Sequence, residues 1–278
     1  LGVVTILPGD PRGIADIVPL DVVVNHIILV SALGANLQLW ARLLQSLADS
    51  ATSSAFTRFI SENVSVGQTA LDIGANQGLY TTELADKVES IGKVHAFEDN
   101  PMMTEILVQN VPANNVFVHG LALSDHEGTR PFYIDTRKGV GAVASSLNVL
   151  TDLHEQKQVA GVSAQTTTVD LFCRREHVIP NFMKIDVEGH ELEVFRGGVE
   201  TINRYRPVLV FEFWETWWNK GVRRIFEFLA NHYQLVRLQD GKEVEIFYYF
   251  HEREGVVDIG CLPLRQRCRR PMNLQFLF

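Results

Sequence analysis

The chain has 278 residues, of which 46% are hydrophobic and 21% are charged. A chain of this length suits one α/β domain with extensions and can bury a sizeable core. Its formal net charge of −8 argues against a protein that binds nucleic acid through a basic face. We therefore expect a globular protein without a nucleic-acid partner.

The three cysteines, Cys173, Cys261 and Cys268, form no C-x-x-C pair. Their odd number argues against a disulfide framework and their spacing against a zinc site, so a reducing compartment is favoured. No basic segment followed by an apolar run resembles a signal peptide. The apolar stretch 14–39 carries Asp and Asn residues that would be costly in a bilayer. We therefore expect a cytoplasmic protein without membrane contact.

Residues 1–50 form an N-terminal extension that stands apart from the motifs further along the chain. About residues 1–45, in which the segment 15–25 leads into an apolar helix, resemble the late part of the reductase domain of fatty acyl-CoA reductases. The extension lacks both a dinucleotide glycine fingerprint and a Tyr-x-x-x-Lys pair. We expect it to have no activity of its own, and an NAD(P)-linked reductase fragment stays open as an alternative.

A short apolar strand at 69–73 runs into a turn with two glycines and then into a helix from Leu79. The strand pattern is typical of the interior of a parallel sheet. Gly74 and Gly78 bracket the turn, where a missing side chain would let a ligand approach the backbone. The combination predicts a nucleotide-type pocket at the carboxyl end of the strand.

Two acids indicate which nucleotide this pocket suits. Asp72 precedes the first glycine and the third glycine of a G-x-G-x-x-G turn is missing, which disfavours a pyrophosphate and suits a cation such as the sulfonium of S-adenosylmethionine. Glu98 ends the next strand, 93–98, where an acid about 20 residues past the turn binds ribose hydroxyls. An ordinary strand–helix turn and a solvated strand-end acid remain the alternatives.

A third motif, Phe182–Glu191, is a strand that runs into an acidic turn. Together with the segments 96–98, 122–125 and 206–212, it resembles the FkbM family of S-adenosylmethionine-dependent methyltransferases over about residues 55–250. That family usually has proline after the ribose acid, whereas this chain has Asp99. The difference leaves the ribose contact intact and affects the local turn geometry.

The resemblance implies a Rossmann-like class I methyltransferase fold, with a mostly parallel seven-stranded sheet, helices on both faces and a reversed C-terminal strand. Tyr233–Leu238 and 244–250 suit the closing strand pair, so we expect the methyltransferase domain at 51–255 and a tail at 256–278. Leu123 and Ser124 would lie beside the adenine. The residues implied for binding S-adenosylmethionine are Asp72, Gly74, Ala75, Asn76, Gly78, Glu98, Asp99, Leu123, Ser124 and Asp186.

Between 125 and 168 the helical period fades. Residues 130–135 alternate like a hairpin strand, and 139–146 form a loop rich in glycine, alanine and serine. Ser145 and Ser146 match a serine pair common in the family and would line the acceptor entrance; an ordinary surface loop is the alternative. A loop of this length is often a lid or a binding loop.

The rim that follows the strand at 182–185 holds the candidate catalytic residues. Asp186 is the first choice for an active-site acid, because ligands bind at the carboxyl ends of strands in open α/β sheets. Crowding by Glu188, Glu191 and Glu212 would raise the pKa of at least one carboxyl group. His190 is an alternative base, although a lone histidine in a turn is more often structural. We expect no metal.

Lys184 lies on the same strand as these acids and is expected to pair with them in a structural role. The family resemblance implies O-methylation of a hydroxyl on a small metabolite, sugar or polyketide-like acceptor. A catalytically silent binding or scaffold module with the same fold stays open as an alternative, because the N-terminal extension and Asp99 depart from the family pattern.

Overall fold

The computed structural model describes residues 50–111, 113–135, 145–146, 159–214, 222–238, 241–243 and 256–264. The chain divides into two compact units, Leu1–Ser54 and Ala55–Phe278, and both described sheets belong to the second. The predicted reductase-like segment, the loop at 139–144 and the predicted strand at 244–250 lie outside the described residues. Among the described helices, none combines the length and the apolar character that crossing a membrane requires.

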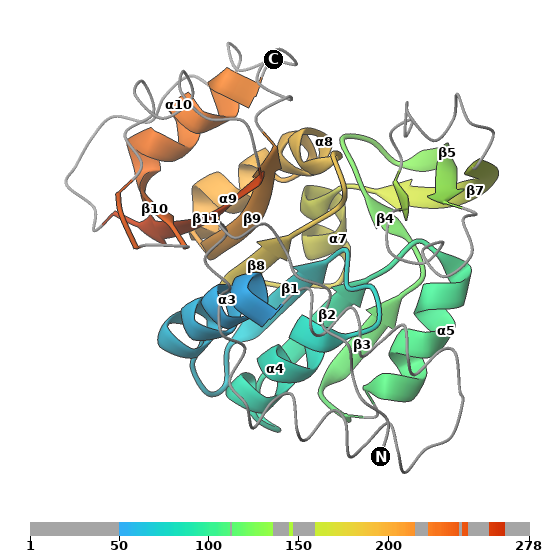
Figure 1. Cartoon of the computed structure of the whole chain (residues 1–278), viewed down its shortest axis with the longest axis horizontal. Helices are drawn as coiled ribbons and strands as arrows, with labels where there is room; N and C mark the ends of the chain where they lie inside the picture. Colours follow the sequence, from blue (N-terminus) through green and yellow to red (C-terminus); the bar gives the residue numbers. More distant parts are fainter. Residues whose placement is uncertain are drawn as a thin grey trace, which may run out of the picture. The chain divides into compact units, whose positions relative to one another are not determined.

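A seven-stranded sheet forms the centre of the second unit, with the strand order β10-β11-β9-β8-β1-β2-β3 (Figure 1). Every adjacent pair is parallel except those of β11, which runs antiparallel to both β9 and β10. The predicted fold class is therefore confirmed, with a mostly parallel sheet and a reversed last strand. The strands are β1 (Thr69–Ile73), β2 (Lys93–Phe97), β3 (Val116–His119), β8 (Phe182–Ile185), β9 (Val208–Trp214), β10 (Tyr233–Arg237) and β11 (Val256–Pro263).

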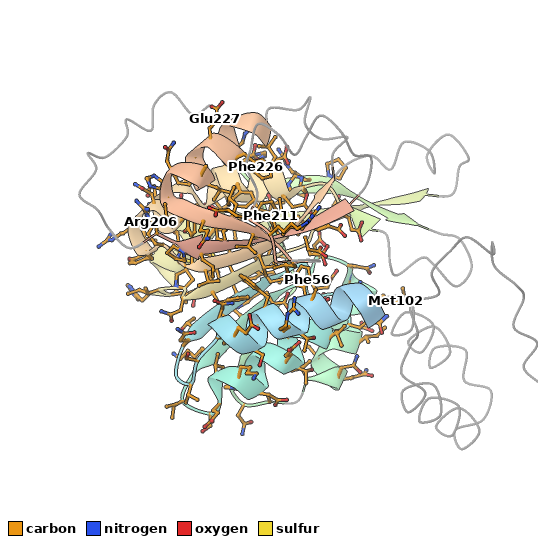
Figure 2. The ribbon with its side chains drawn as sticks, turned by 60° about the vertical axis from the view of Figure 1, so that its left-hand side comes forward. Phe56, Met102, Arg206, Phe211, Phe226 and Glu227 are labelled. Carbon is orange, nitrogen blue, oxygen red and sulfur yellow. The ribbon has the colours of Figure 1, made fainter. Side chains whose placement is uncertain are left out.

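Helices cover both faces of this sheet, because side chains along each strand point alternately to the two sides. Ala70 of β1 packs on the side of α3 and α4, whereas Leu71 packs on the side of α7 to α10. Figure 2 shows Phe56 of α3 and Phe226 of α10 on opposite sides of the sheet. The helices are α3 (Ser50–Asn63), α4 (Leu79–Val88), α5 (Pro101–Asn110), α7 (Val169–Arg175), α8 (Glu191–Gly197), α9 (Val199–Tyr205) and α10 (Val222–His232).

The reversed strand comes from a different part of the chain than expected. We assigned residues from 256 onward to a tail, but Val256–Pro263 form β11, which is inserted between β9 and β10. The side chains of Ile259 and Cys261 are fully buried in the core. The domain boundary at 255 is therefore wrong, because an apolar strand at the end of the domain completes the sheet.

A second sheet has four strands in the order β4-β7-β5-β6. It includes strands from the segment 125–168, in which the sequence shows no helical period. Its strands are β4 (Ala122–Leu123), β5 (Gly128–Asp135), β6 (Ser145–Ser146) and β7 (Val159–Thr167). The predicted hairpin strand is confirmed as β5, which pairs antiparallel with β7 along its whole length. The segment 116–123 is divided between the two sheets, since β3 belongs to the large sheet and β4 to the small one.

Candidate functional site

Backbone hydrogen bonds hold the glycine turn after β1 against the end of β2. The amide groups of Gly74 and Ala75 both donate to the carbonyl oxygen of Phe97, at 3.0 and 2.9 Å. Gly74 has a φ of +79°, and a Cβ atom there would lie 1.8 Å from the carbonyl oxygen of Asp186. Glycine is therefore required at this position by the close approach of the chain itself.

Glycine is also required at position 78 because of close packing. The sequence had indicated a different reason, namely that the missing side chain would let a ligand approach the backbone. The φ of Gly78 is +93°, and a Cβ atom would lie 2.6 Å from Val111 and 2.7 Å from Leu107 of α5. A side chain at either glycine would collide with the protein, since interiors are closely packed. Protein atoms fill the direction in which a side chain would extend from each glycine, so any contact of these two residues with a ligand would come from their backbone atoms.

Asp72 lies in β1, two residues before Gly74, and is fully buried. Its Oδ2 atom accepts a 2.6 Å hydrogen bond from the hydroxyl of Thr81 in α4, and its Oδ1 atom lies 3.3 Å from the Nζ atom of Lys184. A carboxylate in this place was expected to suit a cation. The cation that it meets within the chain is Lys184, so Asp72 holds the site together from inside.

Lys184 connects the glycine turn with the candidate catalytic acid. Its Nζ atom donates a 2.8 Å hydrogen bond to the carbonyl of Gly74 and lies 3.5 Å from Oδ2 of Asp186. Burial by itself lowers the pKa of Lys184, but the carboxylates of Asp72 and Asp186 outweigh it and hold that pKa above its usual value. The expected pairing of Lys184 with the acids is thus confirmed. The side chain of Asp186 remains 31% exposed at the rim.

Glu98 joins the glycine turn to the start of α5. Its Oε2 atom accepts a 2.8 Å hydrogen bond from the amide of Asn76, and its Oε1 atom accepts one of 2.9 Å from the amide of Asn100. Burial raises the pKa of the Glu98 carboxyl group. Asn76 has a φ of +49°, and its buried side-chain Oδ1 atom has no hydrogen-bond partner among the described residues.

Helix α5 has a regular N-terminal cap although Asp99, just before it, replaces the proline usual in the family. The side chain of Asn100 accepts a hydrogen bond from the amide of Met102, and Pro101 occupies the first helical turn, the arrangement that N-termini of helices prefer. Burial and the neighbouring Glu98 raise the pKa of Asp99 to about 7. Asp99 therefore places a second titratable group beside the predicted ribose acid.

The acidic turn after β8 has an unusual backbone. Glu188 and Gly189 have φ values of +51° and +95°, in the region that residues with side chains seldom occupy. The carboxyl group of Glu191 accepts hydrogen bonds from the amides of Val187 and Gly189, at 3.0 and 3.4 Å. The residue after the turn thus holds it in this conformation.

Carboxyl groups gather on this rim and raise one another's pKa values. Burial, followed by the charges of Asp186 and Glu212, raises the pKa of Glu188 to about 8. Burial also raises the pKa of Glu191 to about 8. Asp258 of β11 lies opposite Glu212 of β9 in the register of the two antiparallel strands. Burial and the charge of Glu212 raise the pKa of Asp258 to about 7. Within the described ranges, no three His, Cys, Asp or Glu residues are arranged to hold a metal ion.

Besides Asp72, Ala75 and Glu98, three further predicted site residues have buried side chains. Leu123 and Ser124 are 1% and 0% exposed, and His190 is 2% exposed. Burial and the charge of Arg130 lower the pKa of His190 to about 4, so its imidazole is neutral near pH 7. Any contact of these residues with a ligand would therefore have to come from the backbone or be indirect.

Two residues of this site were missed by the sequence analysis. Thr81, which binds Asp72, lies on the face of α4 that packs on the sheet, and a hydroxyl among apolar positions was the available signal. Asp258 was assigned to the tail, although an acid within the apolar run 256–261 is itself a signal of a special position.

The chain shows similarity to known methyltransferases. The family profile described as Methyltransferase FkbM domain matches residues 72–239, whereas no curated protein matches the chain. A similar solved structure is methyltransferase FkbM from Methylobacillus flagellatus KT, with 15% identity and a TM-score of 0.42, covering 87% of this chain and 60% of that one. This chain thus spans less than two thirds of the length of that protein.

Two further solved structures are similar. One is a SAM-dependent methyltransferase from Aquifex aeolicus, with 16% identity and a TM-score of 0.42, covering 81% of this chain and 97% of that one. The other is a SAM-dependent O-methyltransferase from Thermotoga maritima, with 12% identity and a TM-score of 0.39, covering 80% of this chain and 66% of that one.

Proposed function

This chain belongs to the FkbM family of S-adenosylmethionine-dependent methyltransferases, and we propose that it methylates a hydroxyl group of a small metabolite, sugar or polyketide-like acceptor. The observation that carries the proposal is the link made by Lys184, which ties the glycine turn to Asp186. Methyl transfer between two bound molecules requires that both are held close together. A turn that binds the cofactor and an acid at the same edge of the sheet meet this requirement.

The residues of the turn fit S-adenosylmethionine. The buried Oδ1 atom of Asn76 accepts no hydrogen bond from the residues that the structure describes, which suits a donor such as the amino group of the methionine part. Glu98 is held by two backbone amides at the end of β2, a position that suits ribose hydroxyls. Asp99 and the ends of Gly74 and Ala75 complete the proposed cofactor contacts.

S-adenosylmethionine, when bound, would supply a methyl group on a sulfonium for transfer to the acceptor oxygen, with S-adenosylhomocysteine as the leaving group. The chain has to hold the acceptor in line and take the hydroxyl proton. We assign the proton to Asp186, which is partly exposed at the rim. A positioned base contributes about 10²–10⁴-fold to such a step. Glu188, beside Asp186, would orient the acceptor.

A reducing location agrees with the cysteines that the structure describes. Cys173 and Cys261 are buried free thiols, and burial raises the pKa of Cys173 to about 12. Such thiols are poor nucleophiles and contribute packing. We propose a cytoplasmic location on this basis.

Calorimetric titration with S-adenosylmethionine and S-adenosylhomocysteine, with NADPH as the control, tests the cofactor. We expect micromolar binding of both adenosyl ligands and none of NADPH. Asp72→Asn keeps the size of the side chain but removes the charge facing Lys184, and should weaken binding. Binding of NADPH alone would instead support the reductase alternative.

Turnover tests the catalytic assignment against a panel of hydroxylated acceptors. Asp186→Asn should bind the cofactor normally and lose at least 10²-fold in kcat, whereas Asp86→Asn, an exposed change on α4, should match the parent. Full turnover by Asp186→Asn would contradict the role of Asp186. Cofactor binding without turnover on any acceptor would favour the scaffold alternative.

A further inference from the structure

A buried hydrogen bond joins the small sheet to the acidic turn. The Oγ atom of Ser124, which directly follows β4, lies 2.9 Å from the Nε2 atom of His190, which directly precedes α8. Both side chains are at most 2% exposed. α8 and β4 contact each other and lie side by side in Figure 1.

The direction of this hydrogen bond follows from its neighbours. The hydroxyl of Ser124 donates to Oδ1 of Asp125 at 3.1 Å. Arg130 and His126 lie beside the same carboxylate, at 3.1 and 2.7 Å, and favour its ionised, accepting form. Since the hydroxyl has one proton, the Nε2 atom of His190 must carry the proton and donate to Ser124.

The other ring nitrogen faces a carboxyl group. The Nδ1 atom of His190 lies 3.5 Å from Oε2 of Glu193 and makes no hydrogen bond within the described part of the chain. Together with Asp125, His126 and Arg130, Glu193 completes the set of titratable groups around the imidazole. With the proton on Nε2, the lone pair of Nδ1 faces Glu193, which favours the protonated form of that carboxyl group, and burial raises the pKa of Glu193 in the same sense.

Ser124 and His190 each lie next to a segment that takes part in the proposed reaction. Ser124 follows β4, whose end is the predicted adenine side, and its own amide donates to the carbonyl of Thr167. His190 follows the strained turn that carries Asp186 and Glu188. The contact is also tight on the backbone side, because a Cβ atom on Gly197 of α8 would lie 1.9 Å from the carbonyl of Ser124.

We infer that the hydrogen bond from His190 to Ser124 is a positioning link that sets the acidic turn relative to the adenine side of the cofactor site. His190 therefore acts through Asp186 and Glu188, and does not take the acceptor proton itself. A buried imidazole cannot reach a substrate hydroxyl, whereas a fixed one can hold a strained turn in a conformation that the local backbone disfavours. This role rests on the proposed methyl transfer.

Three variants separate a positioning link from a base. His190→Gln keeps an amide donor with similar reach but removes the imidazole, so we expect kcat to stay within about threefold of the parent. His190→Leu and Ser124→Ala both remove the link. Each should lower kcat about tenfold or more and also weaken cofactor binding, and the double variant should be no worse than His190→Leu, because contacting partners are not additive.

A purely structural role would lower the melting temperature of these variants but leave kcat and the cofactor Kd of the folded protein unchanged. That result would overturn the inference, and so would a loss of 10²-fold or more in His190→Gln, the effect expected when a general base is removed.

A spectroscopic readout tests the link without turnover. Nitrogen NMR of the histidine-labelled protein at pH 7 should show a slowly exchanging proton on Nε2 of His190, which is lost in Ser124→Ala. A proton on Nδ1 would overturn the assignment. If the parent protein binds no adenosyl ligand but shows the Nε2 proton, the proposed function fails while the link itself stands.

Discussion

Lys184 donates a 2.8 Å hydrogen bond to the backbone carbonyl of Gly74, a residue 110 positions earlier in the chain. The two residues lie on neighbouring strands, because β1 and β8 are adjacent and parallel. The same ammonium group faces the carboxylates of Asp72 and Asp186. One buried cation therefore links the glycine turn to the carboxyl group of Asp186 at the rim.

Lys184→Met should strongly destabilise the protein. The change leaves the carboxylate of Asp72 fully buried without its cation, and breaking such a buried pair costs about 3–5 kcal/mol. Urea denaturation measures the loss. Lys87→Met is the control, because the Lys87 ammonium group donates a hydrogen bond to the hydroxyl of the exposed Ser61, and it should cost about 1 kcal/mol or less. Similar losses in both variants would contradict the central role of Lys184.

Glu98→Gln should weaken the binding of S-adenosylmethionine by about tenfold or more, which is about 1.4 kcal/mol or more. A glutamine amide has one acceptor oxygen, so its NH₂ group would face one of the two backbone amides that Glu98 now binds. Calorimetric titration measures the effect. Glu105→Gln, an exposed change on α5, should bind as the parent does; unchanged binding by Glu98→Gln would exclude Glu98 as the ribose acid.

Gly197→Ala should destabilise the protein by about 1–3 kcal/mol through overpacking. The added methyl group would lie 1.9 Å from the carbonyl oxygen of Ser124. At Gly120 the added atom would lie 3.6 Å from Thr104, an ordinary contact, so Gly120→Ala should stay within about 0.5 kcal/mol. Thermal unfolding of both variants measures the difference, and equal melting temperatures would contradict the tight contact between α8 and β4.

Asp258→Asn should make the protein less sensitive to rising pH. The pKa of Asp258 is raised from 3.8 to about 7 in the folded chain, so its contribution to stability is complete below pH 3.8 and is lost as the pH rises through 7. The variant cannot ionise there, and should gain about 2–4 kcal/mol relative to the parent between pH 5 and pH 8.

Denaturation midpoints at pH 5, 6.5 and 8 measure this gain. Glu62→Gln, on the exposed side of α3, is the control and should follow the parent at every pH. A gap between Asp258→Asn and the parent that does not grow with pH would mean that Asp258 is already ionised at pH 5.

Much of the fold could be predicted from the sequence, because its signals are local. The apolar run 69–73 followed by glycine, and the acid that ends the strand 93–98, each mark a strand and its carboxyl end within a few residues. Alternation of such strands with helical segments is enough to indicate a parallel sheet covered on both faces. The family match over 72–239 agrees with that interpretation.

The sequence by itself thus determined the alternation of strands and helices in the parallel part of the sheet and the residues at the ends of those strands. Only the tertiary structure decided which distant residues meet. Insertion of β11 between β9 and β10, the pairing of Asp72 with Lys184 and the contact of Ser124 with His190 depend on strand order and packing. Those contacts form between segments far apart in the chain, and no local pattern of residues encodes them.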